Sequence, residues 1–295
     1  MLELDYFVVD VFTESALAGN PLAVVLNTAN LTSAQMQSIA REFNLSETTF
    51  VERRSSAVEA AEGLRVRIFT TQEELAFAGH PTLGTASVLK LTAPETVHGS
   101  TLTLAENVGP IPVKFAESGT LFGEMTQRNP EFGAELEAAE VARLLGLNVE
   151  DLDATASPQI VSTGTAFAIV VLRSMDALGR LRVRQDEATA WLRARGARWF
   201  YVVTPHGEGG VDFRARMQFN GGEDPATGSA AGCAISYLVA RGMAASGARI
   251  AVRQGVEMGR PSNLFLSARL DGTGVSEVRV AGSTVLVAKG QLFLP

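Results

Sequence analysis

One short motif occurs twice in this chain, 144 residues apart. Pro81-Thr82-Leu83-Gly84-Thr85-Ala86 and Pro225-Ala226-Thr227-Gly228-Ser229-Ala230 share the pattern P-x-x-G-[ST]-A, and each precedes an apolar helical run. A second match, Gly19 with Gly164 before two apolar strands, has nearly the same offset of 145 residues. Two independent matches at one offset predict an internal duplication into two α+β halves, each with a mixed sheet around a central helix that begins at the motif.

Both motifs are typical of helix N-termini that could bind a ligand. Asp224 suits the N-cap position and Pro225 the first helical position. The alignment places His80 opposite Asp224. Because the first turn of a helix has unsatisfied N–H groups and a partial positive charge, each start could hold a carboxylate. A purely structural role, as an N-cap for Asp224 and as a capping histidine for His80, stays open.

Composition limits the chemistry. The net charge is −7, 46% of the 295 residues are apolar, and the chain has one Cys and three His. The chain has no run of Lys and Arg residues that would indicate nucleic-acid binding, and no apolar run is long enough to span a membrane. We therefore expect a soluble cytoplasmic protein with no nucleic-acid or membrane partner. A His/Cys metal site is not expected, and Cys233 is interpreted as a core residue.

The domain organisation follows from the duplication. We expect an N-terminal half at residues 1–128 and a C-terminal half at 129–281. In the tail, Val278–Val280 and Val285–Val287 alternate and are separated by Gly282, with Gly290 beyond them. This pattern predicts a hairpin over 282–295 that could join either half, with the first half as one possibility.

No nucleotide-binding or hydrolase motif is present, which leaves acid–base chemistry by carboxylates and histidine. If the two helix starts face each other across an interdomain cleft, His80 and Asp224 approach a ligand from opposite sides. Glu47 lies between an apolar helix and an apolar strand, so partial burial could raise its pKa towards a useful range. A solvated loop acid is the alternative for Glu47. The segments Arg253–Gly255 and Gly259–Ser262 read as loop elements, with ligand contact a minority interpretation.

Several motifs together resemble the phenazine-biosynthesis PhzF-like family. They occur in order along essentially the whole chain: Gly19-Asn20-Pro21, Asn44–Val51, Phe77–Ala86, Glu223–Ala230, Gln254-Gly255 and Met258–Ser262. The resemblance implies a diaminopimelate-epimerase-like fold of two pseudo-symmetric domains, each with a curled sheet around a central helix. It also implies a homodimer and no metal or organic cofactor. Thr71 and Ala76 depart from the family, which often has prolines there.

By the same resemblance, Glu47 is the acid/base that moves a proton on the substrate, and Asp224 and His80 assist it. Residues implied to hold the substrate are Ser46, Gly79, Gly228, Ser229 and Asn20. The family's phenazine-pathway member isomerises trans-2,3-dihydro-3-hydroxyanthranilate, so the resemblance implies an isomerase acting on a small carboxylate-bearing metabolite.

Two alternatives remain at this level. One is an amino-acid epimerase or racemase, although the related two-thiol enzymes have cysteines that neither helix start has here. The other is a binding protein that keeps the fold without catalysis.

Overall fold

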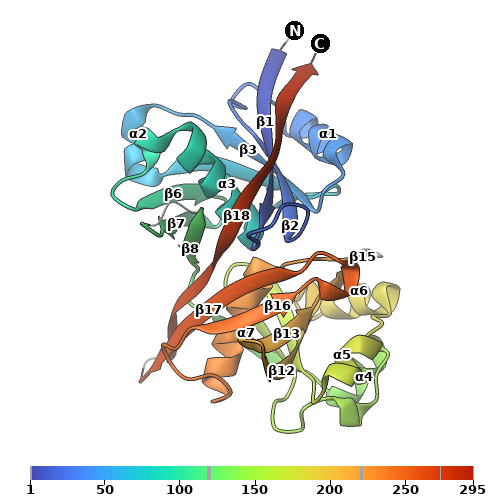
Figure 1. The fold of residues 1–295 in the computed structure, drawn as a ribbon. Helices are drawn as coiled ribbons and strands as arrows, with labels where there is room; N and C mark the ends of the chain where they lie inside the picture. The colour runs from blue at the N-terminus through green and yellow to red at the C-terminus, as the bar shows by residue number, and fades with distance from the viewer. Residues whose placement is uncertain (1, 118–120, 220–221, 273, 295) are drawn as a thin grey trace. The chain divides into compact units, whose positions relative to one another are not determined.

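A computed structural model of the chain describes residues 2–117, 121–219, 222–272 and 274–294. It divides into two compact units, one of Met1–Thr126 with Ala281–Pro295 and one of Gln127–Val280. Each unit is a strand-rich α+β fold (Figure 1). The long strand β18 (Gly274–Leu294) contributes its first part to unit 2 and its second part to unit 1.

The described residues of unit 1 form three α-helices and a set of strands that includes the second part of β18. Its other strands are β1 (Leu2–Val11), β2 (Asn20–Val25), β3 (Glu47–Glu52), β4 (Leu64–Phe69), β5 (Glu74–Leu75), β6 (Thr101–Glu106), β7 (Gly109–Phe115) and β8 (Phe122–Thr126). Its helices are α1 (Ser33–Phe43), α2 (Ser56–Glu62) and α3 (Gly79–Thr92), with a short 3₁₀ helix at Pro94–Thr96.

Unit 2 has a similar inventory. Its other strands are β9 (Glu131–Glu135), β10 (Gln159–Ser162), β11 (Ala166–Val171), β12 (Trp199–Glu208), β13 (Val211–Arg216), β14 (Gln218–Phe219), β15 (Gly222–Glu223), β16 (Ile250–Gln254) and β17 (Ser262–Asp271). Its helices are α4 (Ala138–Leu145), α5 (Met175–Arg180), α6 (Gln185–Arg193) and α7 (Gly228–Ala240), with short 3₁₀ helices at Val149–Asp151 and Val256–Met258.

The pairing of strands repeats between the two units. In unit 1 the neighbours from β1 through β2, β3, β4 and β6 to β7 pair antiparallel, parallel, antiparallel, parallel and antiparallel. In unit 2 the neighbours from β10 through β11, β12, β13 and β16 to β17 pair in the same sequence of directions. The glycines matched in the sequence, Gly19 and Gly164, both have positive φ angles just before β2 and β11. The predicted duplicated α+β fold is therefore confirmed.

Each unit has one helix buried on all sides. Helix α3 is buried from Gly79 to Leu89, and α7 from Gly228 to Val239. A helix that is apolar around its whole circumference must be enclosed, and these two pack against the strands of their own unit. At Gly84 an added Cβ would lie 2.7 Å from Leu22 Cδ2 and 2.8 Å from Val11 Cγ2. The motif glycine of α3 is thus required by close packing on β1 and β2.

The remaining helices cover the outer faces of the sheets. Helix α1 begins at a capping box in which Thr32 and Gln35 satisfy each other's backbone groups. Its buried face, Met36, Ile39 and Ala40, packs on a cluster in unit 1 that includes Phe50. In unit 2, helices α4, α5 and α6 contribute Leu, Val and Ala side chains to a separate buried cluster.

The predicted C-terminal hairpin is wrong. Residues 274–294 form the single strand β18, and neither Gly282 nor Gly290 has a positive φ angle. Gly290 lies opposite Tyr6 on β1, and an added Cβ there would lie 2.7 Å from the Tyr6 hydroxyl. Because glycine in a strand often makes room for a bulky cross-strand neighbour, it gave a false turn signal.

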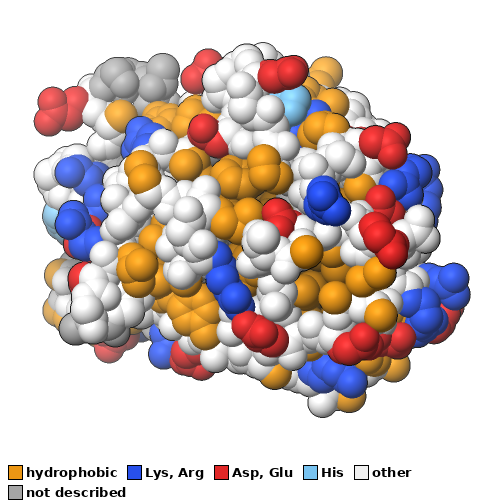
Figure 2. All heavy atoms as spheres, turned by 90° about the horizontal axis from the view of Figure 1, so that it is seen from below, with side chains coloured by type: hydrophobic (Ala, Val, Ile, Leu, Met, Phe, Trp, Pro, Cys, Tyr) orange, Lys and Arg blue, Asp and Glu red, His pale blue; other side chains and the backbone are white. Residues whose placement is uncertain are grey.

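Charged side chains of both signs are interspersed on the face drawn in Figure 2, with hydrophobic side chains between them. Within the described ranges, no helix is long and apolar enough to cross a membrane.

Candidate active site

Three predicted site residues meet inside unit 1. Asn20 begins β2, Glu47 begins the parallel neighbour β3, and His80 lies in the first turn of α3. Asn20 Nδ2 is 3.1 Å from His80 Nδ1, and His80 Nε2 is 3.4 Å from Glu47 Oε2. The register that pairs Leu22 with Glu47 sets the two strand starts side by side. The three side chains therefore form a line from Asn20 through His80 to Glu47.

The protonation state of His80 follows from its surroundings. Its side chain is 4% exposed, and burial lowers its pKa from 6.5 to about 3, so the imidazole is neutral at physiological pH. Asn20 Nδ2–H donates to Nδ1, which leaves the ring proton on Nε2. That nitrogen is the one nearest Glu47. The neutral Nε2–H of His80 thus lies near the Glu47 carboxylate, whose side chain is 13% exposed, but at 3.4 Å the contact does not meet the geometry of a hydrogen bond.

No side chain in the described part of the chain caps the start of α3. Ala78 occupies the N-cap position and has no side-chain group to accept the first N–H groups of the helix. Gly79 is the first helical residue, next to His80. A ligand carboxylate is a suitable partner for such N–H groups.

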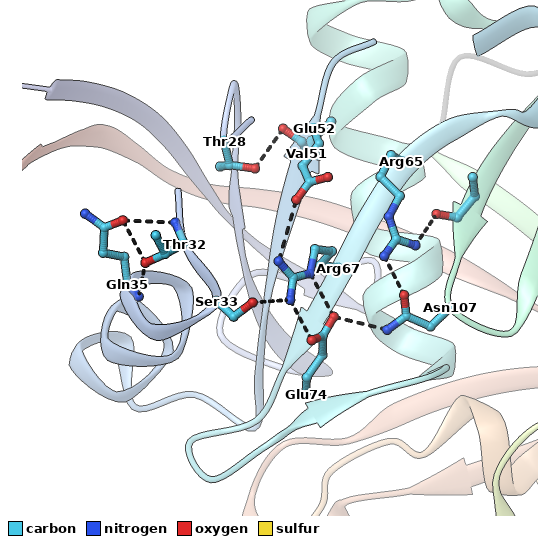
Figure 3. A network of polar contacts seen from close by, with 11 residues as sticks. Thr28, Thr32, Ser33, Gln35, Val51, Glu52, Arg65, Arg67, Glu74 and Asn107 are labelled. Atoms are coloured by element: carbon cyan, nitrogen blue, oxygen red, sulfur yellow. Dashed lines mark hydrogen bonds and ion pairs between the residues drawn. The ribbon is translucent and has the colours of Figure 1, made fainter. Parts of the chain in front are cut away.

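A polar network holds the chain that leads into α3 (Figure 3). Arg67 on β4 makes two hydrogen bonds to Glu74 on β5, at 2.8 and 2.7 Å, and Arg67 also bonds Ser33. Asn107 donates to Glu74 and accepts from Arg65. Strand β5 ends three residues before Ala78, so the network fixes the approach to His80.

The turn between β4 and β5 is tied to α1. Gln37 donates to the Thr70 carbonyl and Arg41 to the Thr71 carbonyl. The Thr70 hydroxyl accepts from the backbone N–H groups of Gln72 and Glu73. These bonds supply local order at the turn that contains Thr71.

A carboxyl group that the sequence did not indicate lies beside the same helix start. Glu106, at the end of β6, is 5% exposed, and its Oε1 is 2.6 Å from Thr82 Oγ1. Burial raises its pKa from 4.5 to about 8, against smaller opposite effects of Thr82 and Arg65. Thr82 Oγ1 is also 2.7 Å from the Ala78 carbonyl. A hydroxyl has one proton, so the Thr82 O–H can donate to Ala78 while a protonated Glu106 donates to Thr82.

In unit 2 the predicted N-cap role of Asp224 is wrong. Helix α7 begins at Gly228 with Thr227 at the N-cap, so Asp224 and Pro225 precede the helix. The Asp224 N–H donates to the Met217 carbonyl, and Asp224 Oδ2 accepts from the Thr227 hydroxyl at 2.6 Å. These contacts hold residue 224 outside the helix, so tertiary hydrogen bonds override the local capping preference.

The first turn of α7 again has no side-chain cap, because the Thr227 hydroxyl is directed to Asp224. Gly228 and Ser229 are the first helical residues and are buried. The Gln127 amide donates to the Gly228 carbonyl at 2.9 Å. The two helix starts therefore share uncapped first turns, but His80 lies inside its helix whereas Asp224 lies four residues before its helix.

Gln254 has a more central place in unit 2 than its loop-like sequence suggests. It is fully buried at the end of β16, and its amide contacts Asp224, Thr227 and Tyr201. Its neighbour Gly255 has φ +76°, and an added Cβ would lie 2.6 Å from the Pro225 carbonyl oxygen. The Gln254-Gly255 segment is thus packed directly on the turn that holds Asp224.

The structure gathers the predicted residues in two groups, each within its own unit. Unit 1 holds Asn20, His80 and Glu47 in contact, with Ser46 and Gly79 adjacent in the chain. Unit 2 holds Asp224 beside Thr227, followed by Gly228 and Ser229 at the start of α7.

Cys233 is buried in the middle of α7, as predicted. Burial raises its pKa from 9 to about 11, so a reactive thiolate is not favoured. Among the described residues, no three His, Cys, Asp or Glu side chains gather in a way that could hold a metal ion.

A cavity of about 880 Å³ opens elsewhere on unit 1, between α2 and strands β4 and β6. Its lining includes Glu106 but none of the predicted site residues. Arg53 and Arg54 at its rim are paired with Glu59 and Glu62. The cavity therefore does not coincide with the Asn20–His80–Glu47 line.

Comparison with known proteins identifies the family of the chain. Residues 9–290 match the family described as phenazine biosynthesis-like protein. An uncharacterized isomerase of Mesorhizobium japonicum is 35% identical over 98% of this chain and 99% of its own length. The trans-2,3-dihydro-3-hydroxyanthranilate isomerase of Pseudomonas fluorescens is 34% identical over 98% and 99%.

Solved structures have the same fold. A Bacillus anthracis phenazine biosynthesis protein of the PhzF family has a TM-score of 0.86 and 25% identity, with all of both chains covered. A probable proline racemase from Agrobacterium radiobacter has a TM-score of 0.66 at 12% identity, over 99% and 93% of the chains, and shows the fold alone. Fold and relatives together define an enzyme of the isomerase class. The chain belongs to the phenazine biosynthesis-like, or PhzF, family.

Proposed function

We propose that this enzyme is a cofactor-independent isomerase that moves a proton on a small carboxylate-bearing metabolite, with Glu47 as the acid/base. The observation that carries the proposal is the Asn20–His80–Glu47 line of contacts in unit 1. The sequence likeness to trans-2,3-dihydro-3-hydroxyanthranilate isomerases supports that compound as the first substrate to test.

In this mechanism Glu47 removes a proton from one carbon of the substrate and returns it to another. His80 Nε2 lies 3.4 Å from the carboxylate and orients it by this contact. Because burial keeps the pKa of His80 at about 3, the imidazole adds no positive charge that would weaken Glu47 as a base. Asn20 fixes the ring tautomer that makes this contact possible.

The uncapped first turns of α3 and α7 supply the binding part of the proposal. The N–H groups near Gly79 in unit 1, and those near Gly228 and Ser229 in unit 2, are each suited to bind a carboxylate and to stabilise negative charge that develops during proton transfer. Asp224 assists the proton transfer, and Ser46 and Asn20 contribute to substrate binding.

The test is turnover of trans-2,3-dihydro-3-hydroxyanthranilate in D₂O, followed by NMR. We expect a product with a relocated hydrogen and double bonds. Exchange at an alpha carbon with loss of optical activity, on an amino acid in place of this compound, would instead support the epimerase alternative. The buried Cys233, whose pKa is raised to about 11, argues against a thiol-based version of that alternative.

A homodimer in the cytoplasm completes the proposal and rests on the family resemblance. Light scattering after size exclusion tests the dimer, with an expected mass of twice the 31.3 kDa of the chain.

A further inference from the structure

We propose that Gln254 is a positioning residue that holds the Asp224–Thr227 turn in its active arrangement. This inference rests on the proposed role of Asp224 and adds a residue to it. Gln254 has no exposed surface, and its side chain contacts three residues of unit 2: Asp224, Thr227 and Tyr201. Its position at the end of β16 places it directly behind the start of α7.

The orientation of the Gln254 amide is fixed by two backbone partners. Its Nε2 donates to the Asp224 carbonyl oxygen at 2.8 Å, and its Oε1 accepts from the Thr227 N–H at 3.1 Å. A carbonyl can only accept and an N–H can only donate, so the reversed amide would lose both bonds. The amide thus bridges the two ends of the turn that precedes α7.

The same amide sets the direction of the hydroxyl on Thr227. Gln254 Nε2 lies 3.0 Å from Thr227 Oγ1 and donates its second proton there. The single Thr227 proton is then free to go to Asp224 Oδ2, 2.6 Å away, which is a better acceptor than the Met217 sulfur at 3.1 Å. Gln254 therefore acts on the Asp224 carboxylate through Thr227.

Tyr201 completes the set on the other side. Its hydroxyl donates to Gln254 Oε1 at 3.1 Å. Each polar atom of the Gln254 amide thereby makes two hydrogen bonds, which are the four that a glutamine side chain can make in this geometry. An apolar side chain of the same length has neither a donor nor an acceptor, so it could make none of these four hydrogen bonds.

Two variants separate positioning from simple packing. Gln254→Met keeps the length and removes every hydrogen bond of the side chain. Gln254→Glu keeps the shape, and while protonated its O–H can replace the bond to Asp224. Burial and the nearby Asp224 raise the pKa of the introduced carboxyl, so this variant ionises and loses that bond as the pH rises.

The control is Gln218→Met. Gln218 also uses both amide atoms on backbone groups, accepting from the Val183 N–H and donating to the Leu181 carbonyl. Its loss reports the general cost of removing a glutamine that braces the backbone of unit 2.

The experiment measures kcat and KM on trans-2,3-dihydro-3-hydroxyanthranilate, together with hydrogen exchange of the Thr227 amide. For Gln254→Met we expect kcat to fall roughly 10- to 100-fold with a small change in KM, because a catalytic group is displaced. Exchange at Thr227 should quicken by about tenfold or more, since its N–H loses its acceptor. The kcat of Gln254→Glu, relative to that of the wild type, should decrease as the pH rises from about 6 to about 9. Gln218→Met should keep the kcat and the pH profile of the wild type.

Unchanged Thr227 exchange in Gln254→Met would overturn the inference even without an activity assay. So would wild-type kcat in Gln254→Met alongside a strong loss in Asp224→Asn, and that result would leave the proposed function intact. Wild-type kcat in Asp224→Asn would instead count against the role of Asp224.

Discussion

Replacing Glu106 by Gln tests the proton that the structure places between β6 and α3. The amide introduced by Glu106→Gln would keep the shape of the protonated carboxyl and its ability to donate to Thr82 Oγ1, 2.6 Å away. Within the described residues, Glu106 Oε2 has no hydrogen-bond partner. Ionisation of Glu106 in the fold would therefore leave a buried charge that Thr82 and Arg65 compensate only in part.

The magnitude follows from the pKa. Burial raises the pKa of Glu106 to about 8, against 4.5 for the ordinary side chain, so the folded protein holds a proton that the unfolded chain releases. That stability is fully present below about pH 4.5 and is lost as the pH rises to about 8. At about 1.4 kcal/mol per pH unit, the wild type should lose about 4 kcal/mol between about pH 5 and about pH 9 relative to Glu106→Gln.

The assay is urea unfolding followed by circular dichroism across this pH range, comparing each variant with the wild type at the same pH. The comparison removes the opposite contribution of His80, whose lowered pKa stabilises the fold above about pH 6.5 and is a cost at lower pH. Glu95→Gln, at an exposed position in the same unit, is the matched control. Its difference from the wild type in the free energy of unfolding should be nearly the same at every pH. A difference between Glu106→Gln and the wild type that stayed constant from acid to alkaline pH would refute the protonated state.

Three further outcomes are expected. Gly84→Ala should destabilise the fold by about 1–3 kcal/mol in urea unfolding, because its Cβ would lie 2.7 Å from Leu22 Cδ2; an unchanged midpoint would contradict the close packing of α3. Cys233 should react with a thiol reagent such as Ellman's reagent only when the protein unfolds, and fast labelling of the native enzyme would contradict its burial. Asn20→Ala should lower kcat roughly 10-fold or more, because His80 loses the bond that fixes its tautomer, and should cost about 1–3 kcal/mol of stability, because a buried ring nitrogen loses its partner; wild-type kcat would remove Asn20 from the mechanism.

The repeated motif predicted the architecture because it lies where the fold is most constrained. Gly84 touches two strands, and the Gly19 and Gly164 turns need positive φ angles, so these positions tolerate few residue types. The same constraints made the duplication visible in the sequence. Strand β4 and helix α1 were also predictable from sequence, since alternation and a capping box are local signals.

The errors arose where distant residues decide the local structure. Gly290 marked a false turn because Tyr6, at the other end of the chain, occupies the space above it. Asp224 was interpreted as an N-cap from its local sequence. The bonds that hold it outside α7 come from Met217 and Gln254, which the local sequence does not reveal. Sequence spacing has no record of such contacts.

The sequence predicted only part of the site, because the contacts that complete it join residues that are distant in the chain. Asn20, Glu47 and His80 come from three separate segments. The repeated motif indicated His80, its place between apolar segments indicated Glu47, and the family resemblance added Asn20 and the role of each. Glu106 has no local signal of importance, because an acid at the end of a strand becomes distinctive only through burial. Gln254 belongs to a motif of the family resemblance, but its local sequence favoured a loop, and its contacts became clear only in the fold.

The most direct test of the proposed mechanism is kcat/KM of Glu47→Gln on trans-2,3-dihydro-3-hydroxyanthranilate, compared with the wild type and with Glu52→Gln. Glu52 lies at the other end of β3, so its variant controls for loss of a carboxylate from the same strand. We expect Glu47→Gln to lose activity by roughly 100-fold or more while its fold and ligand binding persist, because the acid/base is gone. Equal kcat/KM in Glu47→Gln and the wild type would contradict the role of Glu47.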